Sequence, residues 1–235
     1  MTNTTGSSSR AEILRRVRQA LGTTTATAAP TPEDIARDVP RDYATTHATR
    51  TPLQTADLLA EHLADYRAHV HRTDAAGLAA TIARLLTERG SRTAVVPAGL
   101  PGDWLTDARA LDVDVVTDHP GLTPVELDAV DSVVTGCALA IAETGTIVLD
   151  ASPDQGRRAL TLVPDHHICV IRPEQIVESL PQALPRLTPT RPQTWISGPS
   201  ATSDIELDRV EGVHGPRTLE VVMVASDAQV TDFPG

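Results

Sequence analysis

The chain has 235 residues, 40% of them apolar, and a formal net charge of −11. A chain of this length can bury about 70% of the surface that its unfolded state exposes, so its stability requires no metal or disulfide. All 20 basic residues are arginine, which excludes Schiff-base catalysis, pyridoxal phosphate attachment and a phosphate loop with lysine. The negative charge argues against nucleic acid as a partner.

The first residues show no apolar stretch after a basic patch, and the longest apolar run, 133–142, is about half as long as a membrane span. We therefore expect a cytoplasmic chain with no membrane span. Cys137 and Cys169 stand in separate apolar runs, which is typical of reduced core thiols. Two cysteines cannot supply the four thiolates of an iron–sulfur cluster.

The first fifty residues have a composition of their own. Ser9 before an amphipathic stretch, with Gly22 after it, predicts a helix over 10–21. Residues 23–50 are rich in Thr, Ala and Pro and show no sustained period, which is typical of an arm or linker. We therefore predict an N-terminal helix and arm over 1–50 and a compact α/β domain over 51–235. The helix could dock on its own domain, on a second copy or on another protein, and the first two are favoured.

Helical and strand patterns alternate from residue 51 onward. The predicted helices cover 58–66 and 75–89, and the strands between and after them cover 93–97 and 113–117. Several short strand-like runs follow between 131 and 171, including 159–164 and 166–171. A helix is expected over 173–180 and a last strand over 219–224. This order predicts an α/β fold of three layers around a mixed but mostly parallel sheet.

Glu143, Thr144, Gly145 and Thr146 stand between two apolar runs and form the first candidate motif. A carboxylate at a turn between buried strands can be desolvated, and a glycine lets a ligand approach the backbone. Glu143 is therefore a candidate catalytic residue, with the other three as ligand contacts. The alternative is a plain hairpin turn, in which Gly145 supplies a positive φ and the threonines bond locally.

The second motif, 197–206, reads SGPSATSDIE and follows a short strand-like run. Backbone N–H groups and hydroxyls at such a turn suit a carboxylate or phosphate, so Gly198, Ser200 and Ser203 are candidate ligand contacts. The alternative is helix capping, because Ser203 and Glu206 have the spacing of a capping box.

The third motif, 212–217, reads GVHGPR. It offers His214 as a second catalytic candidate, Gly215 as a ligand contact and Arg217 as an anion clamp. An ordinary surface loop explains the same residues. Pairs of histidines at 69 and 71 and at 166 and 167 have no third ligand at a recognisable spacing, so we expect no metal.

Four stretches, TGCALAIAETGTIVL, LVPDHHICVI, SGPSATSDIE and GVHGP, together resemble the LUD-domain family over residues 133–224. The resemblance implies a fold similar to the sheet group of isomerases and CoA transferases. It also implies a role in oxidising L-lactate to pyruvate, as one component of a three-protein system whose partners carry the iron–sulfur clusters. This chain itself is then expected to hold no cofactor.

Two classes of function remain open. In the first, the chain is a non-redox component of a lactate-oxidising complex that binds a small carboxylate or a partner surface. In the second, it is a free-standing enzyme that uses Glu143 as nucleophile or acid/base on an acyl or sugar-phosphate substrate. Few cations stand near the motifs beyond Arg157, Arg158 and Arg217, which favours the first class.

The three motifs are also expected to line one pocket. Ligands in open α/β sheets bind where loops from several strand ends meet, and each motif stands at such an end. A shared small-ligand pocket requires Glu143 and His214 to lie within about 15 Å of each other.

Overall fold

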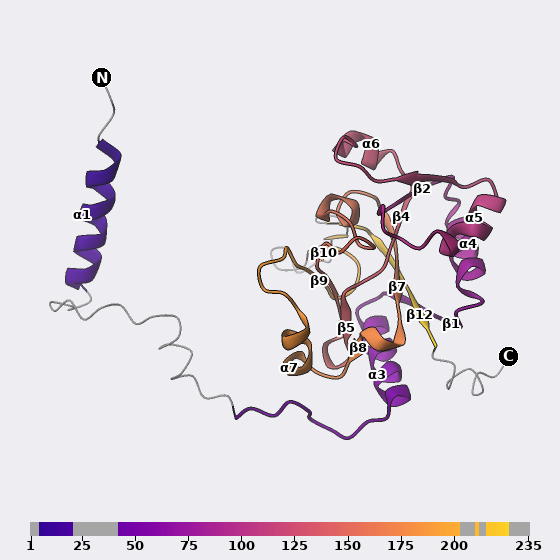
Figure 1. Ribbon diagram of the computed structural model, residues 1–235, viewed down its shortest axis with the longest axis horizontal. Coiled ribbons are helices and arrows are strands. Elements are labelled where there is room, and N and C mark those ends of the chain that lie inside the picture. Colours follow the sequence, from indigo (N-terminus) through magenta and orange to yellow (C-terminus); the bar gives the residue numbers. More distant parts are fainter. Residues whose placement is uncertain (1–4, 21–41, 203–209, 212–214, 226–235) are drawn as a thin grey trace. The chain divides into compact units, whose positions relative to one another are not determined.

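The structure is a computed structural model, and it describes residues 5–20, 42–202, 210–211 and 215–225 (Figure 1). The chain separates into two compact units, Met1–Tyr43 and Ala44–Gly235. Residues 44–50, which the sequence analysis grouped with the arm, are therefore part of the second unit.

The first unit contains helix α1 (Thr5–Ala20), which begins four residues before the expected N-cap Ser9. On the polar side of the helix, the Glu12 carboxylate accepts hydrogen bonds from Arg15 at 2.6 Å and from Arg16 at 2.9 Å. Such pairs one turn apart stabilise a helix locally by a few tenths of a kcal/mol, roughly 0.2–0.5.

The second unit is built on a six-stranded sheet in the order β1-β12-β7-β4-β2-β3. Every neighbouring pair is parallel, so successive strands are joined by crossover segments that cover the two faces. The strands are β1 (His69–Thr73), β2 (Thr93–Val96), β3 (Asp114–Thr117), β4 (Ser132–Thr135), β7 (His166–Ile171) and β12 (Thr218–Val224).

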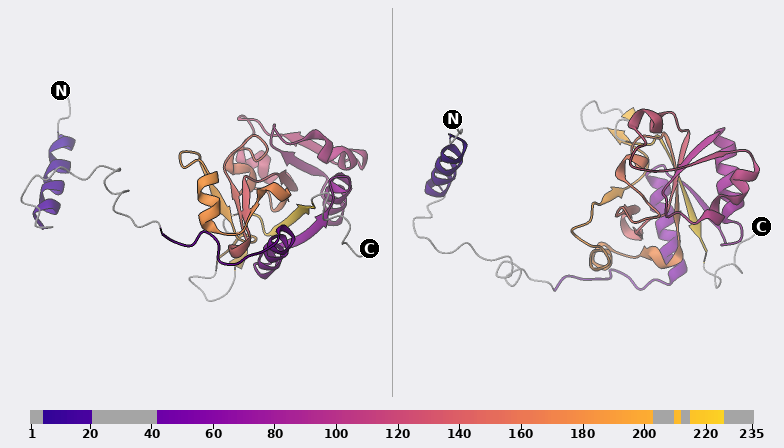
Figure 2. Two further views of the ribbon diagram at one scale, coloured as in Figure 1. Left: turned by 60° about the horizontal axis from the view of Figure 1, so that its bottom comes forward. Right: turned by 45° about the horizontal axis from the view of Figure 1, so that its top comes forward.

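Helices and short 3₁₀ turns lie on both faces of this sheet. One face packs against α4 (Leu78–Arg89), η1 (Gly102–Leu105) and α5 (Thr106–Ala110). The other packs against α3 (Pro52–Asp65), α6 (Pro124–Asp128) and a smaller sheet. Figure 2 shows the magenta segment with α4 and the orange segment 173–196 on opposite sides of the long strands in both views.

The smaller sheet has the order β8-β5-β6-β9. Its strands are β5 (Leu139–Ile141), β6 (Thr146–Leu149), β8 (Ile176–Val177) and β9 (Thr194–Ile196). β6 runs antiparallel to β5 and β9. The α/β class is thus confirmed, but the antiparallel strands do not join the main sheet, because the chain leaves the sheet after β4 and folds back on itself. A two-stranded ribbon, β10 (Ala201–Thr202) and β11 (Val210–Glu211), completes the strands.

Two segments differ from the expected elements. The expected strand over 159–164 is largely the 3₁₀ turn η3 (Arg158–Thr161), whose Leu160 is fully buried. The expected helix over 173–180 is instead the turn η4 (Pro173–Gln175) followed by β8, and helical structure returns in α7 (Leu180–Ala183) and η5 (Leu184–Arg186). The β-branched pair Ile176 and Val177 aligns with β5, so strand pairing overrides the local helical signal.

No helix in the described part of the chain has the length and apolarity that crossing a membrane requires.

Candidate functional site

Glu143 lies in the turn η2 (Ala142–Thr144) between β5 and β6. Gly145 closes the turn with a φ of +55°, as the hairpin interpretation requires. The turn is fixed against α3, because His62 Nδ1 lies 2.8 Å from the Ala142 carbonyl oxygen. The Glu143 N–H donates to the Glu178 carbonyl oxygen at 3.0 Å, which places the backbone of a second acidic residue beside the turn.

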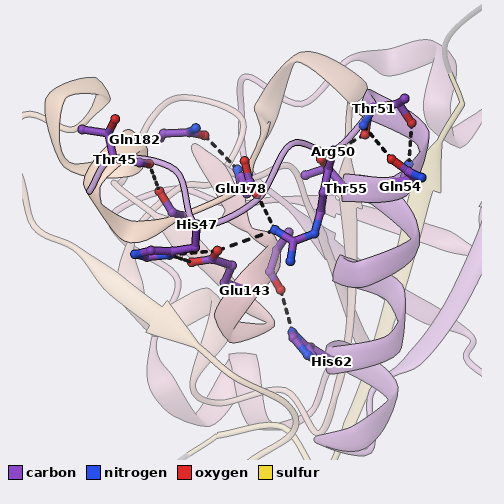
Figure 3. A network of polar contacts seen from close by, with 12 residues as sticks. Thr45, His47, Arg50, Thr51, Gln54, Thr55, His62, Glu143, Glu178 and Gln182 are labelled. Carbon is purple, nitrogen blue, oxygen red and sulfur yellow. Dashed lines mark hydrogen bonds and ion pairs between the residues drawn. The ribbon is translucent and has the colours of Figure 1, made fainter. Parts of the chain in front are cut away.

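The Glu143 and Glu178 side chains, which we call the carboxylate pair, meet His47 and Arg50 from the segment before α3 (Figure 3). His47 Nδ1 lies 2.8 Å from Glu143 Oε2. Arg50 Nη1 forms an ion pair with Glu178 and lies 3.7 Å from Glu143 Oε1. The Glu143 and Glu178 side chains are only 20% and 10% exposed, so the Arg50 guanidinium compensates the charge of two poorly hydrated carboxylates.

Two contacts hold this segment in place. Ser179 Oγ donates to the Thr45 carbonyl oxygen at 2.7 Å, and Thr51 caps α3 through a reciprocal capping box with Gln54. His47 and Arg50 were missed by the sequence analysis, because they stand in a Thr/Ala-rich stretch 96 and 128 positions from their partners. No local pattern marks such long-range pairs.

A cavity of about 570 Å³, the first cavity, opens beside Arg50 and Glu178. It lies near the carboxyl ends of β1 and β12, the edge at which parallel sheets commonly bind ligands. Its walls are mostly apolar residues of α3, β8 and β12, with Arg72 as a second cation. Arg72 Nη2 forms an ion pair with Asp57 Oδ1, 2.6 Å away, so both arginines of the first cavity already have carboxylate partners.

The second motif packs directly on the first. Ser197 Oγ lies 2.9 Å from Thr146 Oγ1, which also accepts a hydrogen bond from Thr144 Oγ1 at 2.8 Å. Gly198 has a φ of +81°, and a Cβ there would lie 2.2 Å from the Tyr66 carbonyl oxygen. Only glycine fits at this position, where the motif passes the end of α3.

The third motif is tied to the second by the Ser200 N–H, which donates to the Pro216 carbonyl oxygen at 2.9 Å. Arg217, the expected anion clamp, donates to Asp165 at 2.6 Å, and Arg89 approaches the same carboxylate at 3.0 Å. Burial pushes the pKa of Asp165 upward, but the two arginines outweigh it and lower that pKa. Ser203 and His214 lie outside the described residues, so the proximity of His214 to Glu143 stays a prediction.

A second cavity of about 290 Å³ opens where the second and third motifs meet. It is bounded by η3, the start of β7 and β9. Of the expected ligand contacts, Gly198, Ser200 and Gly215 line it, and Thr146 reaches its wall through Ser197. Thr144, Gly145 and Arg217 are not among its lining residues.

Two adjacent histidines at the start of β7 are buried without charge. Burial lowers the pKa of His167 to about 3 and that of His166 to about 4. His167 Nε2 lies 2.8 Å from Thr135 Oγ1, and His166 Nδ1 lies 2.7 Å from Ser132 Oγ. Both rings are therefore neutral hydrogen-bonding groups near pH 7.

The histidines of β1 have a carboxylate between them. Glu220 Oε1 lies 2.9 Å from His69 Nδ1, and Glu220 Oε2 lies 2.6 Å from His71 Nε2. Burial opposes the ionised form of Glu220, but the bonds from His71 and His69 lower its pKa overall. Across the described residues, no group of three or more His, Cys, Asp or Glu side chains is arranged to hold a metal ion.

Comparison with known proteins connects this geometry to a family. The family model "LUD domain" matches residues 56–224. "Lactate utilization protein C" of Deinococcus radiodurans is 51% identical over 168 residues, covering 70% of this chain and 76% of that protein. The protein of the same name from Bacillus subtilis is 30% identical over 190 residues, covering 72% and 77%.

A solved structure agrees with these sequence relatives. The crystal structure of a duf162 family protein from Deinococcus radiodurans has a TM-score of 0.65 and 41% identity, covering 75% of this chain and 100% of that one. The resemblance found in the four sequence stretches is confirmed, and the chain belongs to the LUD-domain family.

Proposed function

We propose that this chain is the non-redox component of a system that oxidises L-lactate to pyruvate together with iron–sulfur partner proteins in the cytoplasm. The observation that carries the proposal is the 51% identity over 168 residues to a protein named for lactate utilization. The relative from Bacillus subtilis bears the same name and is matched over a similar share of its length.

The assignment of the iron–sulfur clusters to partner proteins follows from the cysteine content. The whole sequence contains two cysteines, and both are buried. A cluster with four thiolate ligands cannot be assembled from them, so the proposal assigns the electron-carrying clusters to partner proteins. This chain then contributes a binding surface or a small-ligand site.

A genetic experiment tests the role. Deleting the gene should abolish growth on L-lactate as sole carbon source and leave growth on pyruvate unchanged, because the proposed defect lies before pyruvate. A plasmid copy of the intact gene should restore growth. Undiminished growth of the deletion strain on L-lactate would contradict the proposal.

A biochemical experiment tests the partners. The affinity-tagged chain, recovered from cells grown on lactate, should retain proteins that carry the visible absorbance of iron–sulfur clusters. The purified chain alone should produce no NADH from lactate and NAD. NADH production by the pure chain would contradict its assignment as a non-redox component.

The surroundings of Glu143 support a second candidate, an enzyme that uses this carboxylate on an acyl or sugar-phosphate substrate. Glu143 is poorly exposed, contacts His47 and lies 3.7 Å from Arg50, which lines the first cavity together with Glu178. In either role the proposal keeps Glu143 and His214 as catalytic candidates.

Replacing Glu143 with Gln discriminates between a chemical role and a structural one. The amide keeps the size of the side chain, so the free energy of unfolding should change by no more than about 1 kcal/mol, while growth on L-lactate is lost. Glu88→Gln is the control, because the Glu88 side chain is 58% exposed and lies outside both cavities, so its loss should leave growth intact. Normal growth of the Glu143→Gln strain would reduce the motif to a hairpin turn.

A further inference from the structure

The arginines that line the two cavities differ in whether they have a carboxylate partner. In the first cavity, Arg50 and Arg72 each already have a carboxylate partner. In the second cavity, Arg158 is the single charged residue among the described lining residues. Its guanidinium makes no hydrogen bond or ion pair within the part of the chain that the structure describes. Arg158 is exposed, and in a chain with a net charge of −11 a cation at a cavity whose described lining holds no acidic residue is available to bind an anion.

His167, which lines the same cavity, has one ring nitrogen without a partner among the described residues. His167 is 1% exposed and lines the second cavity. Its Nε2 is engaged by Thr135, whereas Nδ1 has no hydrogen-bond partner among the described residues. Because His167 lines the cavity, Nδ1 is a polar atom to which a ligand in the cavity can form a hydrogen bond.

The remaining lining residues set the size and character of a ligand. Leu162, Trp195 and Leu219 give apolar contact, and Thr161 adds a hydroxyl group. A volume of about 290 Å³ lies at the lower limit of small-molecule sites. It suits a ligand of a few heavy atoms rather than a CoA ester.

The single arginine at the cavity indicates whether a phosphate or a carboxylate fits there. A phosphate dianion is usually held by several cations or by the N-terminus of a long helix, and this cavity has one arginine beside the four-residue turn η3. A single guanidinium instead matches one carboxylate, to which it can donate two parallel hydrogen bonds.

We propose that the second cavity binds a small monocarboxylate, with Arg158 as the partner of the carboxylate and His167 as the hydrogen-bonding partner of a hydroxyl or keto group beside it. The choice of lactate and pyruvate as first ligands rests on the proposed function, whereas the carboxylate class rests on the cavity alone.

The test uses the purified full chain and four probes: L-lactate, pyruvate, acetate and the neutral analogue lactamide. Calorimetry should detect binding of the carboxylates and none of lactamide. Trp195 is 42% exposed and lines the cavity, so its fluorescence should change on binding. Trp195→Phe should remove that fluorescence change while calorimetry still detects the ligand.

Substitutions locate the anion partner. Arg158→Gln should weaken carboxylate binding at least tenfold, which corresponds to about 1.4 kcal/mol, and Arg158→Lys should recover part of the affinity. Arg92→Gln is the matched control. The substitution makes the same charge change at an exposed residue that lies outside the cavity. Thermal melting of each variant verifies that it is folded.

Three results would overturn the inference: absence of carboxylate binding, equal affinity for lactamide, or unchanged affinity in folded Arg158→Gln. The growth experiment separates these from failure of the proposed function. A gene that lactate growth requires, whose product binds no carboxylate, refutes only the cavity assignment. A chain that binds carboxylates through Arg158, but whose deletion leaves lactate growth intact, refutes only the lactate role.

Discussion

Gly145 combines an unusual backbone conformation with a close approach to another element. Its φ is +55°, and an added Cβ would lie 2.9 Å from the His62 carbonyl carbon. Backbone atoms of a helix cannot move away as a flexible side chain can, so a methyl group here displaces the turn from α3.

Alanine substitutions separate the two effects. Gly145→Ala should lower the free energy of unfolding by roughly 3 kcal/mol or more, because backbone strain and a steric clash add. Gly90→Ala should cost only about 1 kcal/mol, since Gly90 has a φ of +74° but no atom within 4 Å of its Cβ position. Denaturant unfolding measures both values, and equal losses would show that the contact with His62 is unimportant.

The segment before α3 acts as one element with the Glu143 turn. Arg50→Gln leaves the carboxylate of Glu178, which is 10% exposed, without its cation, and should cost about 2 kcal/mol. In the double variant with Glu178→Gln the loss should be smaller than the sum of the single losses. Arg84→Gln, which breaks the exposed pair with Glu88, should cost less than about 0.5 kcal/mol. Additive losses at Arg50 and Glu178 would mean that the ion pair does not couple them.

The two buried histidines at the start of β7 predict that the folded chain loses stability in acid. Because burial lowers the pKa of His166 to about 4 and that of His167 to about 3 from 6.5, the unfolded chain binds protons in a pH range where the folded chain does not. This contribution to stability is fully present above pH 6.5 and is lost as the pH falls below it.

The free energy of unfolding should therefore fall by about 2 kcal/mol per histidine between pH 6.5 and 4.5. The carboxylates with lowered pKa, Asp165 and Glu220, add their losses at lower pH. Denaturant unfolding at several pH values should show roughly half the slope for His167→Gln, while His119→Gln, in an exposed loop, should keep the full slope. An unchanged slope in His167→Gln would exclude this histidine as a cause.

For the molecule as a whole, the proposal that partner proteins carry the iron–sulfur clusters predicts that the purified chain is colourless and metal-poor. Two buried cysteines and histidines engaged with hydroxyls or Glu220 leave no ligand set in the described residues. A chelator should therefore leave the melting temperature unchanged, and elemental analysis should find no stoichiometric iron or zinc. One metal ion per chain would contradict this prediction.

The sequence by itself determined the features that depend on neighbours along the chain. The periods of 58–66 and 75–89 predicted helices where the structure has α3 and α4. The apolar runs at 93–97, 113–117, 166–171 and 219–224 predicted strands where it has β2, β3, β7 and β12. The positive φ at Gly145 followed from the turn chemistry of its motif. These are local effects of side-chain period and backbone sterics, which neighbouring residues alone specify.

Only the tertiary structure decided which distant residues meet. It placed His47 and Arg50 on the carboxylate pair and paired Arg217 with Asp165. It also left Arg158 at a cavity without a charged partner among the described residues. Side-chain pairs across 96 and 128 positions have no period or spacing in the sequence, because the packing of strands and helices, and not the chain between them, brings their atoms together.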